Sequence, residues 1–236
     1  MLGSVLRALL ATYRRARDAR QEAGLALQRM RTDFRNRRAV TAYNITRKNN
    51  RRAYERVYAD NRLLSEYLAP ERVAFYEQVA EISAQEKPRA VIDVGCGAGN
   101  LLRAVVERTQ PKPERVVGID YANAGIERAR ELVGSGDFRT ESLYDLNLEE
   151  RFDLVLCTEV LEHVRDPKRA VEVLVDLCSP SGAILITVPD GAHDTWEGHR
   201  NFWSQSELET FLAPYGAVEV RRMEGGEMSL LAVIRP

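Results

Sequence analysis

After Pro88, short apolar runs alternate with stretches whose apolar residues recur at helical spacing, and this alternation strongly constrains the fold. The runs are rich in Val and Ile and cover residues 90–94, 115–119, 152–157 and 183–188. Helices are expected between them, at residues 100–109, 122–133 and 167–178. Strands that are apolar on both faces and separated by helices form a parallel sheet covered on both sides. The sequence therefore predicts an open α/β sheet.

The end of the chain shows a different order of elements. A helix is expected at residues 205–212 and strands at 217–222 and 228–234, with Gly225 and Gly226 between the strands. Two strand-like runs joined by a short glycine-containing link are typical of a β-hairpin. We therefore expect an antiparallel C-terminal hairpin at or within the far side of the sheet.

Charge is distributed unevenly along the 236 residues. Residues 1–62 carry 16 Lys and Arg against 5 Asp and Glu, whereas residues 63–236 carry 18 against 30. The first segment has a helical pattern with weak breaks near Asn44 and Asn49, and apolar residues at helical spacing continue in residues 71–83. We predict a basic helical arm at residues 1–62, a helical cover at 63–87 and one domain of catalytic size at 88–236.

The basic arm favours a negatively charged partner, either RNA or an anionic membrane surface. Residues 1–13 have the apolar spacing of an amphipathic helix that could lie in a membrane interface, and packing against another helix is the alternative. No run approaches the roughly 18 apolar residues of a membrane span, so no transmembrane segment is expected. Three widely spaced cysteines fit a reducing compartment, so we expect a cytoplasmic protein that is peripheral on a membrane if the arm binds lipid.

A glycine-rich segment joins the first expected strand to the first expected helix, and it reads Asp93-Val-Gly-Cys-Gly-Ala-Gly-Asn100. Glycines permit a tight turn and a close approach of the backbone to a ligand. The spacing differs from the Gly-x-Gly-x-x-Gly of dinucleotide binders, and the Asp93 carboxylate would repel a pyrophosphate. It suits a cationic ligand such as S-adenosylmethionine, which carries a sulfonium and an ammonium. Asp120 follows about 20 residues later, where a carboxylate can accept hydrogen bonds from ribose hydroxyls.

These residues resemble the class I S-adenosylmethionine-dependent methyltransferases, nearest the ubiquinone-biosynthesis O-methyltransferases. The resemblance covers about residues 88–236 and is carried by the strings at 91–99, 118–120 and 152–164. It implies a Rossmann-like, doubly wound, mostly parallel seven-stranded sheet with S-adenosylmethionine as cofactor. The chain is thus expected to be a methyltransferase with a helical N-terminal extension.

The same resemblance implies roles for individual residues. Asp93 and the glycines would contact the methionine part of the cofactor, Asp120 the ribose and Tyr121 the adenine. Family members usually carry an acid and then a small residue after the third strand, near the adenine; we match Ser142-Leu143 to this place, with Asp145 as the alternative acid. The expected cofactor-binding set is Asp93, Gly95, Cys96, Gly97, Gly99, Asp120, Tyr121, Ser142, Leu143 and Glu159.

A second group of polar residues follows the fourth expected strand. Glu159, Glu162 and His163 are spaced i, i+3 and i+4, which places them on one side of a helical turn. Carboxylates and imidazoles bind divalent metals, and His199 lies after the fifth strand, near the expected acceptor pocket. The predicted metal ligands are Glu159, Glu162, His163 and His199. In the alternative, metal-free interpretation, the Glu-His pair orients the cofactor and packs the pocket.

The Glu-x-x-Glu-His string also resembles that of two metal-associated branches of the family, the ubiquinone-biosynthesis O-methyltransferases and the small-RNA 3′-terminal 2′-O-methyltransferases. A hydroxyl acceptor must lose a proton, so His163 or His199 is expected to act as base or as metal ligand. We expect a small-molecule acceptor, such as a sugar, a glycolipid or a quinone-like phenol. The alternatives are methylation of an RNA ribose and a non-catalytic scaffold that keeps the cofactor fold.

Aromatic residues accompany both expected sites. Tyr54, Tyr58 and Tyr67 are candidates for a lid over the cofactor, and core packing is the alternative for each. An apolar wall for the acceptor is expected from Trp196, Phe202 and Trp203.

Overall fold

The computed structural model describes residues 41–194, 196–223 and 229–236. The chain divides into the units Met1–Asn44 and Ile45–Pro236, and only residues 41–44 of the first unit are described. The predicted amphipathic segment at residues 1–13 and the predicted Gly225-Gly226 turn lie outside the described residues. Within the described part of the chain, no helix is long and apolar enough to cross a membrane.

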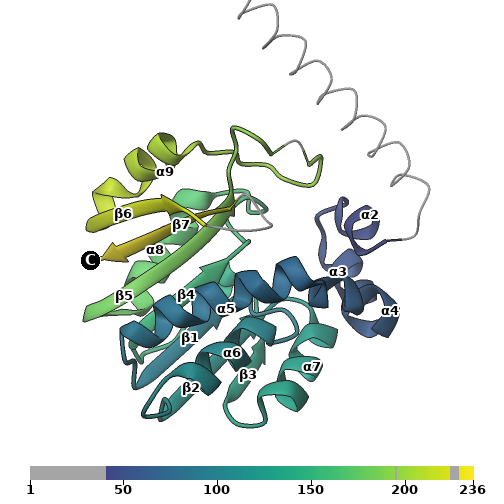
Figure 1. The fold of residues 1–236 in the computed structure, drawn as a ribbon, viewed down its shortest axis with the longest axis horizontal. Coiled ribbons are helices and arrows are strands. Elements are labelled where there is room, and N and C mark those ends of the chain that lie inside the picture. The colour runs from purple at the N-terminus through teal and green to yellow at the C-terminus, as the bar shows by residue number, and fades with distance from the viewer. Residues whose placement is uncertain (1–40, 195, 224–228) are drawn as a thin grey trace, which may run out of the picture. The chain divides into compact units, whose positions relative to one another are not determined.

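The unit Ile45–Pro236 is built on one seven-stranded sheet in the order β3-β2-β1-β4-β5-β7-β6 (Figure 1). The strands are β1 (Ala90–Val94), β2 (Arg115–Asp120), β3 (Asp137–Thr140), β4 (Phe152–Thr158), β5 (Cys178–Pro189), β6 (Ala217–Arg222) and β7 (Ser229–Arg235). Strands β1 to β5 pair in parallel, whereas β7 runs antiparallel to both β5 and β6. The predicted mostly parallel sheet with an antiparallel C-terminal pair is confirmed.

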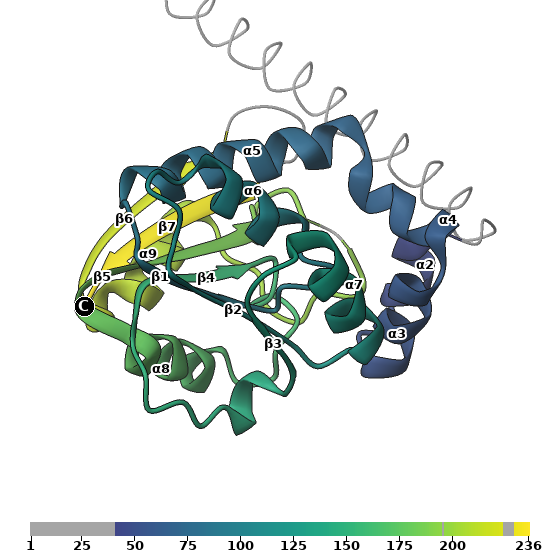
Figure 2. The same cartoon turned by 90° about the horizontal axis from the view of Figure 1, so that it is seen from below.

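Helices cover both faces of this sheet (Figure 2). The covering helices are α5 (Pro70–Gln85), α6 (Asn100–Arg108), α7 (Asn123–Val133), α8 (Pro167–Leu177) and α9 (Gln205–Leu212). Helices α5, α6 and α7 share one apolar cluster with the sheet, and α8 and α9 share the other. Fully burying one Val, Leu, Ile or Phe side chain stabilises a fold by roughly 1.5–3 kcal/mol, which is why strands between two helical layers are apolar on both faces.

The order of the strands positions the site. From β1 the chain proceeds to β2 and β3 on one side of the sheet, and then crosses to β4 on the other side of β1. The loops after β1 and β4 therefore diverge and leave a crevice at the carboxyl ends of the strands, where ligands bind in open α/β sheets.

Short helices precede α5 in the chain. They are α2 (Ala42–Thr46), α3 (Arg51–Ala59), α4 (Asn61–Leu64) and the 3₁₀ helix η1 (Ser65–Leu68). Asn50 caps α3 by accepting a hydrogen bond from the Ala53 N–H at 3.1 Å, which explains the break expected at this position. Helix α3 packs against α7 within the unit Ile45–Pro236. The function of residues 1–62 as a basic arm stays a prediction.

Candidate active site

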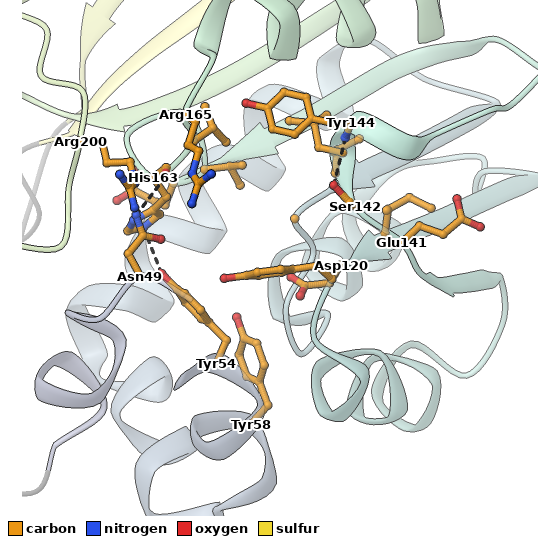
Figure 3. Close-up of a pocket in the computed structure, with 18 residues that line it drawn as sticks. Asn49, Tyr54, Tyr58, Asp120, Glu141, Ser142, Tyr144, His163, Arg165 and Arg200 are labelled. Carbon is orange, nitrogen blue, oxygen red and sulfur yellow. Dashed lines mark hydrogen bonds between the residues drawn. The ribbon is translucent and has the colours of Figure 1, made fainter. Parts of the chain in front are cut away.

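A cavity of about 390 Å³ lies at the carboxyl ends of β1, β2 and β4 (Figure 3). Its lining comes from α3, from the ends of β1 and β2, from the segments that follow β3 and β4, and from the loop between β5 and α9. A volume of this size and a position at the sheet crevice are typical of small-molecule sites. The structure therefore places a candidate active site where the strand pattern predicted one.

The glycine loop forms one side of this site. Gly95, Gly97 and Gly99 have φ of 88°, 52° and 82°, a left-handed conformation that favours glycine. The N–H groups of Gly95 and Cys96 donate to the Ile119 carbonyl at 2.7 and 2.9 Å. Of these residues, the described lining of the cavity includes Gly95 but not Cys96, Gly97 or Gly99.

Tyrosines from α3 cover the loop and face the cavity. A Cβ atom on Gly97 would lie 2.7 Å from the Tyr58 hydroxyl oxygen, so the glycine makes room for this buried ring. Tyr54 and Tyr58 both line the cavity, and the Tyr54 ring lies 5.8 Å from that of Tyr121, which also lines it. Tyr67 packs on Tyr58 with ring centroids 6.1 Å apart. Two of the three tyrosines considered for a lid thus border the cavity directly.

Two buried carboxylates lie beside the glycine loop. Asp120 lines the cavity and accepts hydrogen bonds from the Gly97 N–H at 3.0 Å and the Ala122 N–H at 2.8 Å. Burial raises the pKa of Asp120 to about 6. Burial, and then the charge of Asp120, raises the pKa of Asp93 to about 7, and its Oδ1 atom has no hydrogen-bond partner in the described structure. Such a carboxylate gains most from a nearby cation, so this end of the site fits a positively charged ligand.

The segment after β3 contains a residue that the sequence reasoning missed. Strand β3 ends at Thr140, so the acid and small residue that follow it are Glu141 and Ser142, and both line the cavity together with Leu143. Asp145 is exposed and is not in the described lining. Counting the pair from the first residue after the strand would have found Glu141.

The expectation that Glu159, Glu162 and His163 share a helical turn is wrong. Glu159 adopts a left-handed φ of 55°, and residues 161–163 form a turn in which the His163 N–H donates to the Val160 carbonyl at 2.9 Å. The Glu159 side chain turns toward β5, where its Oε1 accepts a hydrogen bond from the Thr187 hydroxyl at 3.0 Å. Glu159 therefore does not share one helical face with the next two polar residues, although its charge still acts on Glu162.

The structure does bring Glu162, His163 and His199 together. One donor atom from each lies within 4.8 Å of the others, and Glu159 is not part of this group. His163 lines the cavity, whereas Glu162 is 1% exposed behind it. Neither carboxylate oxygen of Glu162 accepts a hydrogen bond from the described residues. His199 Nδ1 is hydrogen-bonded to Asp194, which orients its ring.

The electrostatics of this group follow from its burial. Burial, followed by the charge of Glu159, raises the pKa of Glu162 well above its ordinary value. Burial, followed by His199, lowers the pKa of His163 to about 3, so its imidazole is neutral at physiological pH. A neutral imidazole is the form that binds metals, and a carboxylate without a partner is a ready oxygen ligand. These three residues therefore fit a divalent cation.

The three residues expected to form an aromatic wall lie outside the described lining of this cavity. Trp196 packs against His199 and His163 with ring centroids 4.5 and 5.7 Å apart, and Trp203 stacks on Phe211. Neither tryptophan nor the 47% exposed Phe202 belongs to the described lining of the cavity. Trp196 instead packs on the two histidines, and Trp203 on the last turn of α9.

Curated relatives share part of this chain. A ubiquinone biosynthesis O-methyltransferase of Stutzerimonas stutzeri is 36% identical over 105 residues, which are 42% of this chain and 44% of the relative. The nodulation protein S of Azorhizobium caulinodans is 27% identical over 141 residues, 58% of this chain and 66% of the relative. The chain spans about half the length of the ubiquinone-biosynthesis relatives it matches.

Solved structures share the fold. The N-methyltransferase NodS of Bradyrhizobium japonicum, in complex with S-adenosyl-L-homocysteine, superposes with a TM-score of 0.67 at 21% identity over 79% of this chain and 97% of NodS. A family model described as a methyltransferase domain matches residues 64–222, well over half of the chain. Strands β1 to β6, the glycine loop and the carboxylate at the end of β2 all lie within that match. The protein therefore belongs to the methyltransferase domain family.

Proposed function

We propose that the protein transfers the methyl group of S-adenosylmethionine to a hydroxyl oxygen of a small molecule. The observation that carries this proposal is a single cavity with two chemically different ends. Asp120 lines it beside the glycine loop, and His163 lines it on the side of the segment after β4 (Figure 3). Family membership and the named O-methyltransferases among the relatives support the same reaction.

The acidic end suits the cofactor. Each Asp120 oxygen accepts one backbone N–H and keeps a lone pair for a ribose hydroxyl. Tyr121 and Glu141 border the cavity on the same side, where a ring face and a carboxylate can contact the adenine and its amino group. Gly95 lines the cavity where the methionine part would lie. Asp93 at the end of β1, whose Oδ1 atom has no hydrogen-bond partner among the described residues, favours the positive charge of that part.

The chemistry requires mainly alignment. The cofactor supplies an activated methyl group whose sulfonium is already a leaving group. The protein's residues then need to place the acceptor oxygen in line with that methyl group and to exclude water, as the tyrosines of α3 can do. Tyr54 Oη lies 3.3 Å from His163 Nε2. At this contact α3, which covers the glycine loop, meets the side of the cavity proposed to hold the acceptor.

We further propose that Glu162, His163 and His199 hold a divalent cation. When bound, such a cation would polarise the acceptor hydroxyl and lower its pKa. With a pKa of about 3, His163 is a weak base, so of its two predicted roles we propose that of ligand. Asp194 orients His199 as carboxylates orient metal-binding histidines in other proteins.

The proposed function is tested by titrating the purified protein with S-adenosylhomocysteine in a calorimeter, followed by a methyl-transfer assay with labelled S-adenosylmethionine against phenols and sugars. We expect saturable binding that Asp120→Ala weakens by about tenfold or more, because a charge-assisted hydrogen bond contributes about 1.5–3 kcal/mol. Asp145→Asn is the matched control, since Asp145 is exposed and outside the described lining, and it should change affinity less than twofold. Absence of saturable binding by the wild type would contradict the proposal.

A further inference from the structure

Two arginines line the cavity on the side of His163. Arg165 comes from the segment between β4 and α8, and Arg200 comes from the loop between β5 and α9. Figure 3 shows both side chains beside His163, on the side of the cavity away from Glu141 and Asp120. In the part of the chain that the structure describes, neither guanidinium group has an ion pair or a hydrogen bond.

This lack of a partner contrasts with other arginines of the unit. Arg115 pairs with Glu150 at 2.6 Å, and Arg222 pairs with Asp190 at 2.8 Å. Near the cavity, Glu162 lies buried behind His163, and the Glu159 carboxylate accepts a hydrogen bond from the Thr187 hydroxyl. Two positive charges therefore lie at one end of the cavity, and no carboxylate of the described residues forms an ion pair with either of them.

The backbones that carry these arginines are tied together. The Arg200 N–H donates to the Glu162 carbonyl at 2.7 Å. The Asn201 side chain donates to the carbonyls of Leu161 and Val164, both at 2.8 Å. The two arginines are thus presented from one hydrogen-bonded assembly of loops, although 35 positions separate them in sequence. A preorganised pair of this kind loses less entropy when it binds a ligand.

Guanidinium groups are planar donors that match carboxylates and phosphates in two-point contacts. An oxyanion between Arg165 and Arg200 would relieve their mutual repulsion and occupy their free donors.

We propose that the methyl acceptor carries an oxyanion, a carboxylate or a phosphate, that Arg165 and Arg200 bind while an acceptor hydroxyl faces His163. This inference rests on the proposed methyl transfer and deepens it by naming the chemical class of the acceptor. The cavity is then bipolar: carboxylates attract the cationic donor at one end, and guanidinium groups select an anionic acceptor at the other.

The experiment uses matched pairs of hydroxyl compounds that differ in charge. The protein, saturated with S-adenosylhomocysteine, is titrated calorimetrically with 3,4-dihydroxybenzoate and 4-methylcatechol, and separately with glucose 6-phosphate and glucose. We expect the charged member of at least one pair to bind at least tenfold more tightly than the neutral member. The first pair reports a carboxylate acceptor and the second a phosphate acceptor.

Variants assign the effect to the arginines. Arg165→Gln and Arg200→Gln should each weaken binding of the charged compound by about tenfold, and the double variant should bind the charged and neutral compounds equally. Both side chains are exposed, so folding should be unaffected, which melting temperatures check. Arg221→Gln is the matched control, because Arg221 is an exposed arginine on β6 outside the described lining, and it should leave the preference unchanged.

Three outcomes would overturn the inference. The first is a wild type that does not prefer, or does not bind, the charged compounds. The second is a loss of S-adenosylhomocysteine affinity in the arginine variants, which would assign the pair to the carboxylate of the cofactor. The third is binding and methylation of an RNA oligonucleotide but of none of the small compounds. If the protein fails to bind S-adenosylhomocysteine, the proposed function fails, whereas the same titrations on the free protein still test the anion site.

Discussion

Glu162 lies buried beside His163 and His199, and both of its carboxylate oxygens lack a hydrogen-bond partner among the described residues. A charged carboxylate without a partner is costly in such a place. It can remain there if it is protonated, which its raised pKa allows, or if a cation occupies the space between it and the imidazoles. The protonated state and the cation-bound state of Glu162 predict different effects of the substitution Glu162→Gln.

We expect the protein to bind Co²⁺, with an absorption spectrum that reports carboxylate and imidazole ligands. Glu162→Gln should weaken binding by about a hundredfold or more, since loss of a ligand costs at least as much as loss of a group that supports one. Asp145→Asn should change the affinity less than threefold, because Asp145 is exposed and lies outside both this group and the described lining of the cavity. A protein that binds no Co²⁺, and whose Glu162→Gln variant keeps full stability, would identify Glu162 as a neutral acid.

At the scale of elements, α3 connects the cavity to the rest of the fold. The Glu55 carboxylate accepts hydrogen bonds from the first backbone N–H groups of α7, Asn123 at 2.8 Å and Ala124 at 2.9 Å. Burial tends to raise the pKa of Glu55, but these hydrogen bonds outweigh burial and hold the pKa below its ordinary value. The same helix carries Tyr54 and Tyr58 into the lining of the cavity. Glu55 therefore fixes the cover through the N-terminus of a neighbouring helix.

Glu55→Ala should lower the free energy of unfolding by about 1 kcal/mol, the usual effect of losing a helix cap. It should also weaken S-adenosylhomocysteine binding severalfold, because α3 then holds the tyrosines less firmly over the cavity. Calorimetry and thermal denaturation measure the two effects. Glu107→Gln is the control, because it removes only an exposed ion pair with Arg103 on α6. Equal effects of the two variants would argue against a cover held by Glu55.

Considered as a whole, the unit gathers titratable groups at the carboxyl edge of its sheet. Burial raises the pKa of Asp93 to about 7 and that of Asp120 to about 6, so the folded state binds more protons than the unfolded state as these acids titrate. Their contribution to stability therefore falls as pH rises through these values. The lowered pKa of His163 acts in the opposite direction, but its contribution is complete above about pH 6.5, the ordinary pKa of histidine.

Between pH 6.5 and pH 8, Asp93 and Asp120 therefore determine whether stability rises or falls with pH. We expect the free energy of unfolding of the ligand-free protein to fall across this window, by about 1 kcal/mol from Asp93 alone. Urea denaturation at the two pH values measures the change, and Asp93→Asn should reduce it. Constant or rising stability across the window would contradict the protonation assigned to Asp93.

Local pattern predicted much of the architecture. The expected helix at 205–212 is α9, and it begins with a capping box: the Ser204 N–H donates to Glu207 at 2.8 Å. Residues that are neighbours in sequence determine such features, as they do the apolar runs and the tight glycine loop. For the same reason Asp120, Ser142 and His163 could be placed near one crevice from sequence alone.

What the sequence by itself determined was the order of strands and helices and the positions of the residues at the carboxyl ends of strands, because these depend on short-range periodicity and chain direction. Only the tertiary structure decided that Arg165 and Arg200 share one end of a cavity with His163, that Glu159 lies outside the group of Glu162, His163 and His199, and that α3 covers the glycine loop. The physical reason is that burial, and with it the pKa and the pairing of each charged group, depends on which distant segments pack around it.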